Sequence, residues 1–348
     1  MLARKLLCCL VCLLPMSAAA YGADAAPKPV RVGVLGLDNY QAVAYAQLFN
    51  SPKAEGDLAG IKVVAAYPAA SSDDIPESVD GLPKWKKQIQ GFGVELVDSI
   101  DELLKRSDAI MIMSLDGRVH LAQATPVLKA HKPLYIGRPL AAQFADAVAI
   151  LKLAEETKTP CWSSSQHRFS PGFIGMRNHP EVGKVIGADV YGGFPTEPHH
   201  ADMYWHAVHS IETLYTIMGP GCVSVTCAAT PTAEVVTGIW KDGRVGTYRG
   251  IKQGALKYSA TVFGDKGVST AGIYGHGVPE KGIVPTKDKY MGYEGIAIEM
   301  GKFFKTGVVP VPPSETIEMF TLMEAAHESK RQNGASVKLE DVLAKVKK

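Results

Sequence analysis

The chain has 348 residues, of which 46% are hydrophobic and 21% are charged, and its formal net charge is +2. A chain of this length and composition can bury the cores of two globular domains. The small net charge gives no reason to expect a nucleic acid or an anionic membrane surface as a partner.

The chain begins with the pattern of a secretory signal peptide. A short basic start precedes an apolar run over residues 6–16, and Ala18 and Ala20 fit the small-residue cleavage pattern. The apolar run is too short to span a bilayer, and it carries no twin-arginine motif. We therefore assign residues 1–26 to a signal peptide and expect a periplasmic or secreted protein without stable membrane insertion.

Strand and helix patterns alternate over the first half of the mature chain. A short strand and a helix fall within residues 94–106, with Asp98 or Ser99 as the natural N-cap. Other strands are expected within residues 30–36, 61–68, 108–115, 132–141 and 160–169, and helices within 40–50, 120–131 and 144–158. This alternation predicts an α/β fold with a doubly wound parallel sheet. We assign residues 29–162 to a Rossmann-like domain of the NAD(P)-binding type.

The second half has a different order of predicted elements, because most strands are followed directly by another strand. They are expected within residues 183–193, 222–229, 233–240, 245–251, 256–265 and 268–275, with one helix near 203–217 and helices again at 293–307 and 314–334. The pattern predicts a C-terminal α/β domain with a large open, mostly antiparallel sheet. We assign this domain to residues 163–335, for substrate binding and oligomerisation, and residues 336–348 to a tail. Cys222 and Cys227 are five apart on one strand, so we expect buried thiols on opposite faces.

Several segments resemble the Gfo/Idh/MocA oxidoreductases. They are RVGVLGL at 31–37, HLAQATPVLKAHKPLYIGRPLA at 120–141, SSQHRFSPGF at 164–173, EVGKVIGADVYGG at 181–193 and the ending at 300–339. The resemblance implies a fold that binds NAD(P) and an enzyme that oxidises or reduces sugars, polyols or their derivatives. It implies a small-molecule carbohydrate as substrate and a homo-oligomer built on the open sheet. Fold alone does not fix chemistry, so each site residue needs its own argument.

The nucleotide-binding turn departs from the family pattern. It keeps Gly36 but has Asp38 and Gln41 where G-x-G-x-x-G has its second and third glycines. A carboxylate and a phosphate charge 4 Å apart repel each other by about 4 kcal/mol at a protein surface. If a nucleotide binds at all, the resemblance implies contacts from Gly36, Asp38 and Asn39. Free NAD(P) is a cytoplasmic cofactor, so a signal peptide for unfolded export also argues against it.

Arg138 stands where the family has the lysine of a Glu-Lys-Pro loop. The family's lysine positions substrate and assists proton transfer. Arginine keeps the charge and can clamp a carboxylate or a sulfate, but it hardly ever releases a proton.

The resemblance implies a catalytic helix with the pattern D-x-G-x-H-x-x-D, and this chain has Trp205, Ala207, His209 and Glu212 at those positions. The histidine is kept and the last acid is replaced by Glu, whereas the first Asp and the Gly are lost. His209 is the main candidate for a catalytic acid or base, because imidazole titrates near neutral pH. A structural histidine is the alternative. The candidate catalytic residues are His209, Glu212, Arg138 and His120, and the candidate substrate-binding residues are Arg168, Gln166, Trp205 and Tyr204. An ion pair is the alternative for Arg168, and core packing is the alternative for the two aromatic residues.

Histidines are dense just before this position. On one continuous helix, Asp202, His206 and His209 would be spaced i, i+4 and i+7 on one face. Two imidazoles and a carboxylate suit a zinc-like divalent ion, with His199 or His200 completing the ligands. The alternative is a polar helix start that lines a sugar cleft.

The sequence leaves three functional hypotheses. The first is an exported, carbohydrate-directed enzyme with an eroded nucleotide site, which acts on a sugar or keto-sugar by His-centred acid/base chemistry with or without a metal. The second is an NAD(P)-dependent sugar or polyol oxidoreductase with a divergent glycine turn. The third is a non-catalytic sugar-binding protein.

Overall fold

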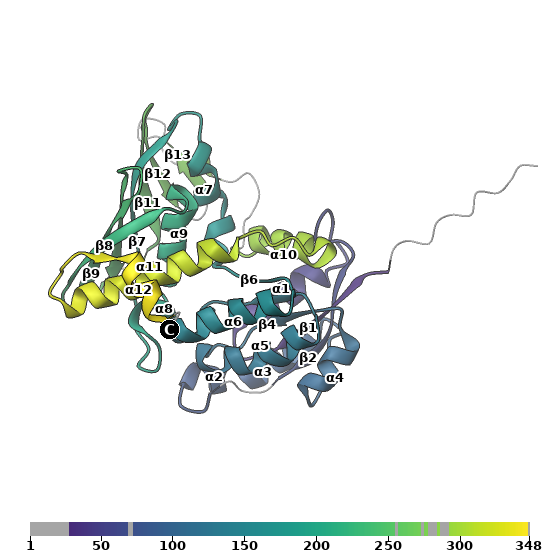
Figure 1. The fold of residues 1–348 in the computed structure, drawn as a ribbon. Helices are drawn as coiled ribbons and strands as arrows, with labels where there is room; N and C mark the ends of the chain where they lie inside the picture. Colours follow the sequence, from purple (N-terminus) through teal and green to yellow (C-terminus); the bar gives the residue numbers. More distant parts are fainter. Residues whose placement is uncertain are drawn as a thin grey trace, which may run out of the picture.

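The structure is a computed structural model that describes residues 28–68, 72–254, 257–272, 275–277, 284–285 and 292–346. The predicted signal peptide lies outside these residues. Figure 1 shows two halves, each built around one sheet. None of the helices within the described ranges is long and apolar enough to cross a membrane.

The N-terminal half contains a parallel sheet of six strands in the order β3-β2-β1-β4-β5-β6. The strands are β1 (Val30–Leu35), β2 (Ile61–Tyr67), β3 (Glu95–Leu96), β4 (Ala109–Ile112), β5 (Leu134–Ile136) and β6 (Cys161–Ser163). The helices between them are α1 (Tyr40–Phe49), α2 (Pro76–Asp80), α3 (Leu82–Gln90), α4 (Ile100–Arg106), η1 (Gly117–Val119), α5 (His120–Lys129) and α6 (Phe144–Glu156). This confirms the predicted doubly wound sheet. Its strand order reverses between β1 and β4, the point at which such sheets bind their ligands.

Gly36 forms the turn between β1 and α1. Its φ of +89° lies in the left-handed region, and an added Cβ would lie 2.3 Å from the Ser114 Oγ and 2.5 Å from the Ser114 backbone nitrogen. Glycine therefore lets this turn approach the end of β4 closely.

We expect Gly36→Ala to lower the free energy of unfolding by about 3 kcal/mol, because it adds a backbone clash to an unfavourable φ. Urea unfolding followed by circular dichroism measures the change. Gly56→Ala is the control, since Gly56 has a φ of +57° but nothing within 4 Å of an added Cβ. Only the φ penalty of about 1 kcal/mol applies there. Equal losses at the two positions would contradict the role of the close approach.

The C-terminal half contains a sheet of nine described strands in the order β14-β13-β12-β11-β7-β10-β9-β8-β15. Neighbouring strands are antiparallel except for the parallel pair β7–β10. The strands are β7 (Val185–Gly193), β8 (Cys222–Ala229), β9 (Ala233–Trp240), β10 (Val245–Ile251), β11 (Ser259–Gly264), β12 (Val268–Gly272), β13 (Gly275–Gly277), β14 (Val284–Pro285) and β15 (Val337–Lys338). The open, mostly antiparallel sheet is thus confirmed.

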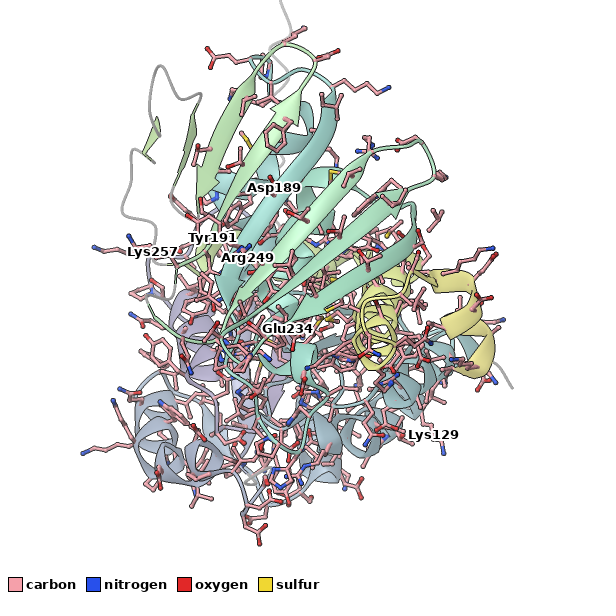
Figure 2. All side chains as sticks on the ribbon, turned by 90° about the vertical axis from the view of Figure 1, so that its left-hand side faces the viewer. Lys129, Asp189, Tyr191, Glu234, Arg249 and Lys257 are labelled. Carbon is pink, nitrogen blue, oxygen red and sulfur yellow. The ribbon has the colours of Figure 1, made fainter. Side chains whose placement is uncertain are left out.

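Helices cover one face of this sheet and leave the other face open. Helix α9 (Val208–Met218) packs on β7, and α11 (Pro313–Arg331) packs on β8. The remaining helices of this half are η2 (Gln166–Phe169), α7 (Pro171–Ile174), η3 (Gly175–Asn178), α8 (Asp202–Trp205) and α12 (Leu339–Val346). Figure 2 looks onto the open face, where Asp189, Tyr191 and Arg249 lie on the neighbouring strands β7 and β10.

Helix α10 (Glu294–Thr306) belongs to the N-terminal half, although it follows the large sheet in the chain (Figure 1). Its buried Ile296 and Phe303 share a core with Val32 and Phe49. Residues 163–335, which we assign to the C-terminal domain, therefore include one helix, α10, that packs in the first domain.

Candidate functional site

Asp38 lies at the point where the order of the parallel sheet reverses. It is fully buried, its Oδ1 accepts a hydrogen bond from the backbone N–H of Leu115 at 3.1 Å, and its Oδ2 accepts one from the Ser78 Oγ at 2.6 Å. The side chain of Asn39 caps α1 by accepting from the backbone N–H of Gln41 at 3.0 Å. A pyrophosphate at this turn would therefore meet a buried carboxylate and a helix N-terminus that is already capped.

Loops from both halves meet beside Asp38. Ile75, Leu115 and Trp205 form a small buried apolar cluster, which joins the loop after β2 and the end of β4 to the second half. Next to it, the backbone N–H of Gly117 donates to the Nε2 of His200 at 3.0 Å. The two halves are thus in direct contact over the turn.

His209 lies in the first turn of α9 with 3% of its surface exposed. Its Nδ1 shares a hydrogen bond of 2.6 Å with the Ser165 Oγ. That Oγ also accepts from the backbone N–H of His167 at 3.1 Å, and the backbone N–H of Ser165 donates to Glu212 at 2.7 Å. These contacts fix the orientation of the imidazole, and its Nε2 has no hydrogen-bond partner among the described residues.

Glu212 and Arg168 support the site from behind rather than contact a substrate. Glu212 is 1% exposed and accepts hydrogen bonds from the Ser164 Oγ and, at 2.7 Å, from the Arg168 Nε. The Arg168 Nη1 donates to Glu315 on α11 at 2.7 Å. The predicted catalytic role of Glu212 is therefore corrected to a positioning role, because all its contacts hold other protein groups. For Arg168 the structure favours the alternative of an ion pair.

Two further histidines and Arg138 lie next to His209. The ring centroids of His167 and His206 lie 4.8 Å and 5.7 Å from that of His209, and the Tyr258 ring is 4.6 Å from His167. Burial, and then the charge of Arg138, lower the pKa of His167 to about 4 and the pKa of His206 to about 3. The same two causes hold the pKa of His209 well below its ordinary value. All three imidazoles are thus neutral at pH 7.

Arg138 follows β5 and is half-buried. Its Nη1 donates to the backbone carbonyl of Trp205 at 2.9 Å, whereas its Nε is buried and has no hydrogen-bond partner among the described residues. Burial lowers the pKa of Arg138, and the groups that act against this are tyrosines, the first of them Tyr258. The predicted position of Arg138 at the site is consistent with these contacts.

His120 lies apart from this group. It is fully buried, with its Nδ1 3.2 Å from the carbonyl oxygen of Leu140 and its Nε2 2.9 Å from that of Ser114. Burial lowers its pKa. Its proposed catalytic role is wrong, because both ring nitrogens face backbone carbonyls.

The three other predicted substrate contacts also serve the protein itself. Gln166 is half-buried and accepts a hydrogen bond from the Gln41 side chain at 3.3 Å. Tyr204 is fully buried against Phe320, at 4.8 Å between ring centroids. Trp205 is 8% exposed and belongs to the apolar cluster described above. Stacking of Tyr204 or Trp205 on a sugar ring is therefore corrected to core packing.

The arrangement expected for a metal is wrong, because the chain does not form one continuous helix here. It breaks at His206, between α8 and α9, so Asp202, His206 and His209 do not share one helix face. The Asp202 carboxylate instead accepts from the Lys330 Nζ at 2.8 Å.

The remaining proposed ligands are also engaged elsewhere. His199 and His200 each form a hydrogen bond of 2.6 Å with Glu197. Across the part of the chain that the structure describes, no three His, Cys, Asp or Glu side chains are placed to hold a metal ion.

Sequence reasoning missed three residues of the site, namely Ser165, His167 and Tyr258. The first two flank Gln166 in the segment that carried part of the family resemblance, so that segment held a usable signal. Tyr258 precedes β11, and no local pattern could place it beside residues almost a hundred positions earlier.

Residues 30–165 match the model of a family described as an oxidoreductase family with an NAD-binding Rossmann fold. No curated protein is similar enough in sequence to count as a match.

Solved structures share the fold over almost their whole length. A candidate myo-inositol dehydrogenase from Sinorhizobium meliloti 1021 is 19% identical with a TM-score of 0.69, covering 89% of this chain and 99% of that chain. A candidate NADPH-dependent oxidoreductase from Desulfitobacterium hafniense is 15% identical with a TM-score of 0.74, covering 91% and 99%. A scyllo-inositol dehydrogenase from Lactobacillus casei is 14% identical with a TM-score of 0.67, covering 90% and 99%.

Sequence identities this low show only that the fold is shared. The family match over residues 30–165 shows in addition that the first domain is related to that family. The resemblance seen in the sequence is thus confirmed: the N-terminal domain of this chain belongs to the Gfo/Idh/MocA oxidoreductase family, and the described chain has the fold of the solved oxidoreductases.

Proposed function

We propose that this protein is an exported enzyme that acts on a sugar or keto-sugar by proton transfer at His209, and that its own side chains close its nucleotide crevice. The observation that carries the proposal is the fixed imidazole of His209. Ser165 holds its Nδ1, Glu212 holds Ser165, and its Nε2 remains free of protein hydrogen bonds among the described residues. A neutral, oriented imidazole can accept a proton as a general base, although its lowered pKa makes it a weaker base than a free imidazole.

The contacts of Asp38 support the idea of a closed crevice. In this arrangement the turn does not fit a dinucleotide, since the carboxylate of Asp38 already bonds to Leu115 and Ser78 where a pyrophosphate would lie. The apolar cluster of Ile75, Leu115 and Trp205 closes the same place from the second half.

The second candidate is an NAD(P)-dependent sugar or polyol oxidoreductase. The match of residues 30–165 to an NAD-binding family favours it, as do the inositol dehydrogenases among the proteins of the same fold. In that case Arg138 would hold the substrate beside His209.

Native mass spectrometry of the protein, purified without added cofactor and then mixed with NAD⁺ or NADPH, separates the two candidates. We expect no nucleotide bound in either preparation. One nucleotide per chain would overturn the closed crevice and restore the second candidate.

The same spectrum tests two further proposals. Export predicts a chain that lacks about the first 26 residues, as the signal-peptide pattern implies. A homo-oligomer is proposed because the open sheet face exposes Tyr191, Ile239 and Val245, and it predicts the mass of more than one chain.

A further inference from the structure

The site contains two arginines in opposite electrostatic situations, the buried Arg168 and the half-buried Arg138. Arg168 is paired with two carboxylates, Glu212 and Glu315, at 2.7 Å each. Arg138 forms no ion pair with any Asp or Glu of the described residues, and its one hydrogen bond there goes to the backbone carbonyl of Trp205. A charge withdrawn from water without a partner destabilises the free protein, and arginine cannot lose its proton to avoid this.

One edge of the Arg138 guanidinium is free to bind a ligand. Because Nη1 is engaged by Trp205, the edge formed by Nε and Nη2 has no hydrogen-bond partner among the described residues, and its Nε is buried. Two parallel N–H groups on one edge of a guanidinium match the two oxygens of a carboxylate.

Two polar atoms near this edge of Arg138 also lack hydrogen-bond partners among the described residues. The Nδ1 atoms of His167 and His206 are buried without hydrogen-bond partners in the described chain. Both rings lie beside His209, and the charge of Arg138 acts on all three imidazoles. Unpartnered buried polar atoms that gather around one cation indicate a place for a polar, anionic ligand.

We propose that the Nε–Nη2 edge of Arg138 binds a carboxylate of the substrate, so that the site acts on a sugar acid rather than on a neutral sugar. This inference rests on the proposed function, because it names the substrate class of the same site. Burial is the first cause of the lowered pKa of His209, and the charge of Arg138 is the second. A bound carboxylate offsets this second cause, which makes the imidazole a stronger base when substrate is present.

Isothermal titration calorimetry at neutral pH tests the proposal. The probes are glucuronate, galacturonate and gluconate, with glucose and galactose as neutral counterparts and glucose 6-sulfate as a different anion. We expect at least one sugar acid to bind about 10- to 100-fold more tightly than its neutral counterpart, as for a charge-assisted bidentate pair. In Arg138→Gln this preference should vanish, and in Arg138→Lys it should fall but persist, because the charge remains and the fork is lost.

Arg106→Gln is the matched control, since Arg106 lies exposed on α4 and pairs with Glu95 at the surface. It should leave the preference unchanged. Thermal melting of each variant shows that it is folded, and Arg138→Lys keeps the test valid if Arg138→Gln does not fold.

Three results would overturn the inference: equal affinity for acids and neutral sugars, a preference that survives in Arg138→Gln, or an Arg138-dependent preference for the sulfate alone. Conversion of neutral sugars with no binding of acids would sink the inference and leave the proposed function intact. Binding of acids that depends on Arg138, without any conversion, would support the inference and count against the proposed function.

Discussion

Replacing His209 by glutamine is expected to lower turnover about 10²- to 10⁴-fold, the usual contribution of a general acid or base. Glutamine is polar and of similar size, but it cannot take up a proton. NMR detection of solvent deuterium in the carbon skeleton of the sugar, with a panel of sugars, sugar acids and keto-sugars, measures the proton transfer itself. A His209→Gln enzyme that exchanges deuterium at the rate of the unmodified enzyme would exclude His209 from the reaction.

Two other variants separate catalysis from general damage. His131→Asn changes an exposed histidine with a φ of +55°, which asparagine tolerates, and should leave turnover unchanged. Ser165→Ala removes the partner of the His209 Nδ1 at 2.6 Å. Because Ser165 positions the imidazole, Ser165→Ala should lower turnover about tenfold. It should also shift the pH–rate profile, because the ring loses the contact that orients it.

The fold could be predicted from the sequence because its signals are local. Buried strands and amphipathic helices alternate with the right periods, and Ser99 caps α4 by accepting from the backbone N–H of Glu102, as one of the two predicted N-caps. The glycine turn after β1 also falls where the pattern put it. His209 and Arg138, the two centres of the proposed chemistry, came from motif spacing that survives in this chain.

The predictions that were wrong concerned places where a strand or helix is irregular at a single residue, or where segments distant in the chain are in contact. Cys222 and Cys227 are both buried in the same core, not on opposite faces, because the pairing of β8 with β9 shifts register between Cys222 and Ser224. In the same way, the helix break at His206 separates Asp202 from His209, so the i, i+4, i+7 spacing does not place the proposed metal ligands on one helix face.

Asp38 shows why a motif departure can be read in two ways from sequence. A carboxylate in a glycine turn suggested only repulsion of phosphate. In the structure it also has a structural role, since it joins the turn to the segment after β4 through Leu115 and to α2 through Ser78. Both partners are far from it in the chain, so no local pattern could reveal them.

The protein is expected to lose stability steeply between neutral pH and about pH 5, because it buries histidines in the neutral form. The pKa values of His167 and His206 are lowered to about 4 and about 3, and that of His209 is held well below its ordinary value, in each case by burial first and then by Arg138. In the unfolded chain all three titrate near 6.5. Below that pH the unfolded state therefore binds more protons than the folded state, and stability falls as pH falls.

His167 and His206 each cost roughly 2 kcal/mol at pH 5, which together is a large part of the stability of a typical domain, and His209 acts in the same direction. Carboxylates held by ion pairs, such as Asp74 with its lowered pKa beside Arg118, lose their contribution only at lower pH, so the histidines dominate this window. Urea unfolding at about pH 7.5 and pH 5 measures the loss. His206→Gln should reduce the difference in the free energy of unfolding between the two pH values by roughly 2 kcal/mol, because it removes one proton-binding site from the unfolded state. Equal stability at the two pH values would mean that the imidazoles around Arg138 take up protons in the folded protein, and His209 would then be charged, not a neutral base, at acidic pH.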